Sequence, residues 1–215
     1  MNRTIRVALT VLCFVFLISS RLISQTTYDI QLLPPAFKNN ATLMQALQNR
    51  KSTRSYIEKE LSLQQLSDLL WAANGVNREA SGKRTAPTAH DEREIDVYVA
   101  TAKGLYLYDA DNHFLTLVLK EDIRALTGKQ KFVKKAAVNL VFVADYDKIR
   151  GKRKSKDFCS ATDTGFISQN VYLYCAAEGL ATVVRGWVNR ERLAKKMGLR
   201  KEQKIILAQT VGYAK

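Results

Sequence analysis

The sequence predicts an α+β fold with a mixed sheet. Two segments carry apolar residues at helical spacing behind capping residues, and several short segments are rich in β-branched and aromatic residues. These helical and extended segments follow each other in irregular order instead of alternating strictly, which favours α+β over α/β. With 215 residues, 47% of them hydrophobic, the chain can bury one sizeable core.

Residues 1–24 are predicted to be a signal peptide or an N-terminal anchor, and residues 25–215 to form one domain. Arg3 and Arg6 precede an apolar run that is short for a membrane span, and small and polar residues follow it. We therefore expect an exported, periplasmic protein. Because Arg21 lies inside the cleavage region, a chain held at the membrane by an uncleaved segment is the alternative.

The first elements of the domain are predicted from turn and capping chemistry. Residues 26–40 contain Pro34-Pro35 and are expected to form an extended arm. A helix is expected over 41–50, with Thr42 or Asn40 as its cap. A second helix is expected from Ser62, whose capping box includes Gln65, to a stop at Gly75.

The remaining elements follow from composition. The polar segment 77–94 predicts a loop, and the contiguous charges of 148–157 predict a mobile surface loop. The segment 136–145 is apolar at nearly every position, which predicts a strand buried on both faces. Further strands are expected over 95–100, 104–110, 113–119 and 202–213, and helices over 121–128, 162–184 and 189–199, the second of these being central and apolar most of the way round.

Several classes of site are disfavoured. Neither GxSxG nor GxGxxG occurs, and two histidines leave little room for a catalytic triad or a zinc site. After removal of the leader only Cys159 and Cys175 remain; they could pair, although Cys175 lies in an apolar run typical of a buried thiol. The net charge of +14 suits anionic ligands, or is simply a solvated basic face. Basic and aromatic residues are not interleaved, so we expect no nucleic acid partner.

The segment "RKSTRSY" places three cations beside three hydroxyl groups between the two predicted helices. Arg50, Lys51 and Ser52 leave a helix together, so their donors can face one anion; arginine offers a planar fork and lysine a point charge. This pattern favours a phosphate site. A solvated connector is the alternative for Arg50 and Lys51.

Four segments resemble the nitroreductase family of FMN-dependent oxidoreductases. "LQNRKSTRSY" looks like its N-terminal basic motif, "APTAHDEREIDVYVA" like its loop before a strand, "AAEGLATVVRGWV" like its Gly-Leu-Gly-Thr segment, and "QTVGYAK" like its closing strand. They occur in the family's order and cover about residues 30–215. The segments "LLWAANGVNR" and "DTGFISQNVYL" are similar in sequence to the branch of the family that includes peptide azoline dehydrogenases.

This resemblance implies a nitroreductase-like fold, with a mixed, mainly antiparallel sheet surrounded by helices. It also implies FMN as the cofactor and a homodimer with the flavin at the interface. The resemblance implies that Arg50 and Ser52, together with Lys51, bind the FMN phosphate. It places Arg54 near the ribityl end of the cofactor and Lys215 as a second basic ligand of the phosphate. Along the flavin ring it implies Pro87, Thr88, Ala89 and Asp91, with the backbone of the turn Val184-Arg185-Gly186 near N5.

Two departures from the family's pattern bear on the ring site. Thr88 replaces a common serine and keeps a hydroxyl, whereas Asp91 replaces a common asparagine, losing an amide donor and adding a charge. Ordinary loop capping is the alternative role for both. No catalytic residue is implied, since a flavin requires binding and orientation rather than an acid–base pair.

The expected function is therefore hydride or electron transfer through flavin N5 to or from a small organic substrate. An azoline-type peptide dehydrogenase is one alternative, and a non-catalytic flavin- or anion-binding protein is another.

Overall fold

The computed structural model describes residues 28–36 and 41–215. The predictions made for residues 1–24, and for Asn40 as a helix cap, lie outside these residues. Within the part of the chain that is described, no helix combines the length and the apolar character needed to cross a membrane.

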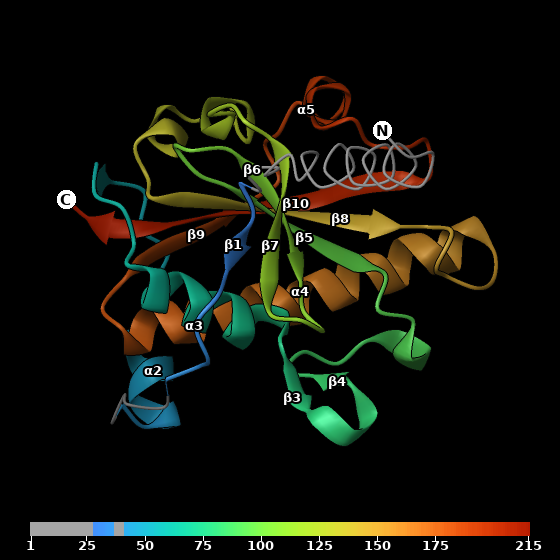
Figure 1. The fold of residues 1–215 in the computed structure, drawn as a ribbon, viewed down its shortest axis with the longest axis horizontal. Coiled ribbons are helices and arrows are strands. Elements are labelled where there is room, and N and C mark those ends of the chain that lie inside the picture. The colour runs from blue at the N-terminus through green and yellow to red at the C-terminus, as the bar shows by residue number, and fades with distance from the viewer. Residues whose placement is uncertain (1–27, 37–40) are drawn as a thin grey trace, which may run out of the picture.

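An eight-stranded sheet lies at the centre of the described residues (Figure 1). Every strand pair in it is antiparallel. Its main path runs, in spatial order, through β1 (Ile30–Gln31), β7 (Phe114–Leu119), β6 (Leu105–Asp109), β5 (Ile95–Ala100), β8 (Val138–Asp145), β10 (Gln203–Ala214) and β2 (Tyr56–Ile57), and β9 (Ala181–Arg185) also pairs with β10. All residues of β8 are buried, which confirms the predicted strand with two covered faces.

Helices cover both faces of this sheet. Figure 1 shows α2 (Leu43–Asn49), α3 (Leu63–Asn74) and α4 (Arg153–Ala177) on one side, and α5 (Arg190–Met197) on the other. Leu69, Leu70 and Phe142 are fully buried in the larger core cluster between α3, α4 and the sheet. Leu193 of α5 anchors a second cluster on the opposite face. The predicted α+β class is confirmed.

Local capping chemistry determines where the first two helices begin and end. The Thr42 hydroxyl accepts from the Gln45 N–H in a capping box at the start of α2. Ser62 and Gln65 form the same motif at the start of α3. Gly75 ends α3 as predicted; its backbone is extended rather than left-handed, and a Cβ there would lie 2.6 Å from the Trp71 ring.

The segment 148–157 differs from its prediction, because α4 already begins at Arg153. Two contacts hold this first part of the helix. Lys156 Nζ donates to the carbonyl of Tyr146 at 2.6 Å, and the Tyr146 hydroxyl donates to Asp157. The charged residues therefore lie on exposed helical turns, and only residues up to Lys152 remain a loop.

The far end of α4 also differs from the predicted range of 162–184. The helix ends at Ala177, Gly179 adopts a left-handed φ of 68°, and the Leu180 N–H donates to the Cys175 carbonyl at 2.8 Å. The residues Ala-Thr-Val-Val-Arg then form β9. Ladder pairing with β10 and β-branched side chains outweigh the apolar continuity that suggested a longer helix.

The burial of α4 is one-sided rather than all round. Ile167, Val171 and Cys175 are buried, whereas Phe158 and Phe166 on the other face are 72% and 43% exposed. Cys159 and Cys175 are both free thiols, and burial raises the pKa of Cys175. The prediction that Cys175 is a buried thiol is confirmed.

Two smaller predictions are also corrected. The segment 77–94 contains a short hairpin of β3 (Val76–Arg78) and β4 (Lys83–Arg84). Within 121–128 the chain makes only a 3₁₀ turn, Arg124–Leu126, because Asp122 satisfies the backbone N–H of Arg124 locally and the apolar face is too short to support a full helix.

Candidate functional site

The basic segment, residues 50–54, lies along the edge of the sheet between α2 and β2. Arg50 is the C-cap of α2, and the Thr53 N–H donates to the Thr182 carbonyl of β9 at 2.9 Å. Directly after the segment, Tyr56 of β2 pairs with Ala214 of β10. The basic segment is therefore fixed by a backbone hydrogen bond to β9 and, through the nearby Tyr56, by the pairing of β2 with β10.

Tyr172 of α4 joins this segment to the end of β9. Its hydroxyl lies 2.8 Å from Ser52 Oγ and accepts from the Val184 N–H at 3.0 Å. The Arg50 guanidinium lies 5.5 Å from the centre of the Tyr172 ring, within cation–π range. Three predicted residues from two separate segments, Arg50, Ser52 and Val184, thus meet around one buried tyrosine.

The cations of this region have no carboxylate partner within the described residues. Arg50, Lys51, Arg54 and Lys215 are exposed and form none of the ion pairs that the structure contains. The Lys215 N–H donates to the Ser55 carbonyl at 3.2 Å, which brings the chain end to the basic segment. Unpaired cations beside a serine hydroxyl are the donor set that a phosphate monoester requires.

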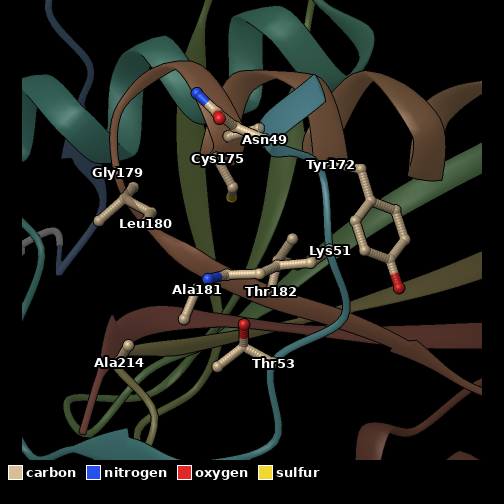
Figure 2. A pocket seen from close by; sticks show the side chains of 11 residues that line it. Asn49, Lys51, Thr53, Tyr172, Cys175, Gly179, Leu180, Ala181, Thr182 and Ala214 are labelled. Atoms are coloured by element: carbon tan, nitrogen blue, oxygen red, sulfur yellow. The ribbon is translucent and has the colours of Figure 1, made fainter. Parts of the chain in front are cut away.

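A cavity of about 290 Å³ lies behind the basic segment, between α4, β9 and the end of β10 (Figure 2). Figure 2 shows the Lys51 amino group pointing into it, towards Ala181. Thr53 also lines the cavity, whereas Arg50, Ser52 and Arg54 do not. Because side chains alternate along an extended segment, Lys51 faces away from the anion site that its neighbours could form. The structure therefore does not bring Lys51 together with Arg50 and Ser52.

The loop 87–91 uses its polar side chains to hold its own conformation. Thr88 Oγ1 donates to Glu94 at 3.1 Å and accepts from the Arg93 N–H. Asp91 accepts two hydrogen bonds of 2.9 Å from Arg93, and this pairing lowers the pKa of Asp91. The charge that Asp91 brings in place of an amide is thus neutralised within the loop.

The backbone of this loop is unusual. His90, Asp91 and Arg93 adopt left-handed φ values of 54°, 56° and 51°. Such residues are uncommon outside glycine, and clusters of them mark tight turns and binding loops. Pro87 is exposed, and the Ala89 N–H donates to Asp163 at 2.9 Å, which ties the loop to α4.

Within one chain, the loop and the basic segment contact different ends of α4. The loop is tied to Asp163 and the basic segment to Tyr172, nine residues further on, which corresponds to about 13 Å along a helix. Figure 1 shows the two regions on opposite sides of the molecule. The structure therefore brings together Arg50, Ser52, Arg54, Val184 and Lys215, but leaves Pro87, Thr88, Ala89 and Asp91 apart from them.

The predicted turn Val184-Arg185-Gly186 is partly strand. Val184 and Arg185 are the last residues of β9, and the exposed Gly186 follows. Arg185 is 4% exposed and its side chain points into the protein, so Gly186 is the exposed residue of this turn.

Three candidate functional residues were not predicted from the sequence: Tyr172, Glu94 and Asp163. Tyr172 stood in a segment interpreted as helix core, although a tyrosine in an apolar helix signals a hydroxyl that needs a partner. Glu94 and Asp163 are 1% and 3% exposed, and burial, with the nearby Asp163 charge, raises the pKa of Glu94. No pattern in the sequence indicated that these two acids meet. Among the described residues, no group of three His, Cys, Asp or Glu side chains could hold a metal ion.

Comparisons with known proteins agree with this fold. The model of the nitroreductase family matches residues 47–213. A Methanocaldococcus jannaschii protein described as a nitroreductase is 32% identical over 155 residues, 67% of this chain and 78% of that protein. A crystal structure from Ralstonia eutropha, also described as a nitroreductase, is 46% identical with a TM-score of 0.83, over 87% of this chain and 90% of that chain.

More distant structures share the fold alone. A chain of the Escherichia coli microcin synthetase complex is 20% identical with a TM-score of 0.68, over 86% of this chain and 77% of that chain. The Vibrio harveyi NADPH:FMN oxidoreductase, complexed with NAD⁺, is 18% identical with a TM-score of 0.61, over 80% and 68% of the two chains. The predicted nitroreductase-like fold is confirmed, and the chain belongs to the nitroreductase family.

Proposed function

We propose that this protein is an FMN-dependent oxidoreductase whose flavin phosphate binds at the basic segment. The observation that carries the proposal is the junction at Tyr172, where Ser52 and the end of β9 meet beside cations that pair with no carboxylate among the described residues. Bound FMN supplies hydride transfer at its N5 atom, and the chain supplies binding and orientation.

In this proposal the phosphate is held by charge-assisted hydrogen bonds. Arg50 presents its guanidinium fork, held over the Tyr172 ring, and Ser52 donates its hydroxyl. Lys215 supplies a second cation from the end of β10, and Arg54 lies one alternate position beyond Ser52 on the same extended segment. Lys51 contributes only its charge, because its amino group points into the cavity.

The ring side of the site requires a second copy of the chain. The loop 87–91 and the basic segment are separated along α4 within one chain, so a two-fold partner is the simplest way to place both against one flavin. Phe158 and Phe166 give α4 an exposed apolar face that a partner can cover. We therefore propose a homodimer with the flavin between the subunits.

For the electron source, we propose a small organic substrate and slow or absent reduction by NADH and NADPH. The basis is the predicted export of the chain, together with the resemblance to azoline dehydrogenases and the absence of a dinucleotide motif in the sequence. Anaerobic stopped-flow spectra of the loaded protein test this point, because rapid bleaching of the flavin by either nicotinamide would overturn it.

The flavin assignment itself is tested by purification of the full chain. We expect a yellow protein with an oxidised-flavin spectrum, from which heat releases FMN and not FAD. The same protein should bind added FMN stoichiometrically after removal of its cofactor. A chain that stays colourless and shows no FMN binding on titration would overturn the proposal and leave the anion-binding alternative.

A further inference from the structure

Arg185 is a buried cation surrounded by neutral groups. Its Nε donates to Thr210 Oγ1 at 2.8 Å, Nη1 to the Thr127 carbonyl at 2.8 Å and Nη2 to Asn139 Oδ1 at 3.0 Å. Only 4% of the residue is exposed, and no carboxylate pairs with it among the described residues. All three guanidinium nitrogens donate hydrogen bonds, but no opposite charge among the described residues pairs with the group.

Such an arrangement is costly. Burial of a charge without a counter-ion is unfavourable even when its hydrogen bonds are satisfied. The same burial lowers the pKa of Arg185 to about 10, so the group still carries its charge at neutral pH. Other arginines of this chain avoid the cost, since Arg93, Arg124 and Arg200 each contact an aspartate.

A neutral residue stands where a counter-ion would fit. Gln130 Oε1 is buried and has no hydrogen-bond partner within the described residues. A Cβ built on Gly128 would overlap Arg185 Nη1 and would lie 2.8 Å from Gln130 Oε1. The side chains of Arg185 and Gln130 therefore both approach Gly128 and lie close to each other. A glutamate at position 130 would have the same shape and would supply the missing charge.

The position of Arg185 connects this charge to the candidate site. Arg185 is the last residue of β9, and its backbone lies between Val184, which is bonded to Tyr172, and the exposed Gly186. The side chain points inward, towards Thr127, Asn139 and Thr210. The guanidinium therefore belongs to the turn whose backbone the family resemblance implies near flavin N5.

We propose that the uncompensated charge of Arg185 raises the reduction potential of the bound flavin. Two electrons and one proton added to the neutral ring give a reduced ring with one net negative charge. A fixed cation in a poorly screened interior stabilises that charge without contacting the ring, because it needs no reorganisation of water. This inference rests on the proposed function, and Arg185 acts in it through electrostatics alone.

The experiment compares reduction potentials of the FMN-loaded full chain. Gln130→Glu neutralises the charge of Arg185 and leaves its hydrogen bonds in place. Gln31→Glu makes the same chemical change on an exposed strand and is the control. Each potential is measured by anaerobic spectroelectrochemical titration, and the affinity for oxidised FMN is measured by fluorescence on the same samples. Arg185→Met is the second variant, with a thermal melt to show whether it folds.

We expect Gln130→Glu to make the equilibrium constant for two-electron reduction about tenfold less favourable, which lowers the potential by about 30 mV. Gln31→Glu should leave it unchanged, and folded Arg185→Met should shift it in the same direction as Gln130→Glu. A flavin-loaded Gln130→Glu protein with an unchanged or higher potential would overturn the inference and leave Arg185 a purely structural residue. Failure of the wild-type chain to bind FMN would overturn the proposed function itself, and it would be seen before any variant is compared.

Discussion

The side-chain oxygens of Ser52 and Tyr172 lie 2.8 Å apart, although 120 residues separate them in the chain. The same tyrosine hydroxyl accepts from the Val184 N–H, so one atom links the basic segment, α4 and β9. Because Tyr172 is buried, no water can replace its hydroxyl easily, and the geometry of the candidate phosphate site depends on it.

Tyr172→Phe should weaken both the fold and the site. The variant keeps the ring beneath Arg50 but leaves the Val184 N–H and Ser52 without their partner, at a cost of about 1–3 kcal/mol. We expect a lower unfolding midpoint in urea and a weaker affinity for FMN. Tyr213→Phe, which loses a hydroxyl bond to Gln65, is the matched control: it should lower stability without changing FMN affinity. Equal FMN affinities of the two variants would contradict this account.

Arg50→Ala should release the flavin during purification. Removal of one charge-assisted contact to phosphate costs about 1.5–3 kcal/mol of binding free energy, which raises the dissociation constant for FMN roughly tenfold to hundredfold. Arg153→Ala removes another exposed arginine, at the other end of α4, and should retain the flavin. Fluorescence titration with FMN measures both. Full occupancy in Arg50→Ala would remove this arginine from the site.

Glu94→Gln should change how stability depends on pH. Burial and the Asp163 charge raise the pKa of Glu94 in the folded chain, so the folded chain holds this proton more tightly than the unfolded chain. Wild-type stability should therefore fall as pH rises above about 4.3, the ordinary glutamate value, towards the folded pKa. The amide cannot ionise, so we expect the stability of the variant relative to wild type to be greater at pH 8 than at pH 4.

Urea unfolding across a pH series measures this difference. Glu60→Gln is the control, since Glu60 is exposed and forms an ion pair with Lys103 at the surface. A constant difference between Glu94→Gln and wild type at every pH would show that Glu94 does not titrate as proposed.

Phe166→Glu should break the proposed homodimer. Phe166 is 43% exposed on the face of α4 that carries Phe158, and a carboxylate buried there would cost several kcal/mol. Sedimentation velocity should show a dimer for wild type and a monomer for the variant. Val118→Glu places the same charge on an exposed residue of β7 and should remain dimeric. A monomeric wild-type protein, or an unaffected variant, would contradict the proposed interface.

Much of the local structure could be predicted because its causes are local. Thr42 with Gln45, and Ser62 with Gln65, specify helix starts within four residues, and the structure contains both capping boxes. The uniform apolar pattern of β8 likewise predicts burial on both faces. The family resemblance was carried by short motifs of the same kind, and the comparisons confirm it.

Predictions failed where distant pairing decided the outcome. The sequence from Asp163 to Val184 is apolar enough for one helix, but pairing with β10 turns its last part into β9. The contiguous charges of 148–157 predicted a loop, but contacts of Tyr146 with Lys156 and Asp157 hold the second half of this segment in a helix. Local propensity is too weak to decide either case against tertiary contacts.

The sequence by itself determined the family, the helix caps, the buried central strand and the residue types of a phosphate site. Only the tertiary structure decided how those residues are placed. Ser52 and Val184 meet at Tyr172, Lys51 points into the cavity, and Arg185 is buried with no counter-ion in the described part of the chain. Side-chain periodicity and capping act over a few residues and can be read directly. Contacts between residues more than a hundred positions apart depend on how the whole sheet and α4 pack, and no local pattern encodes them.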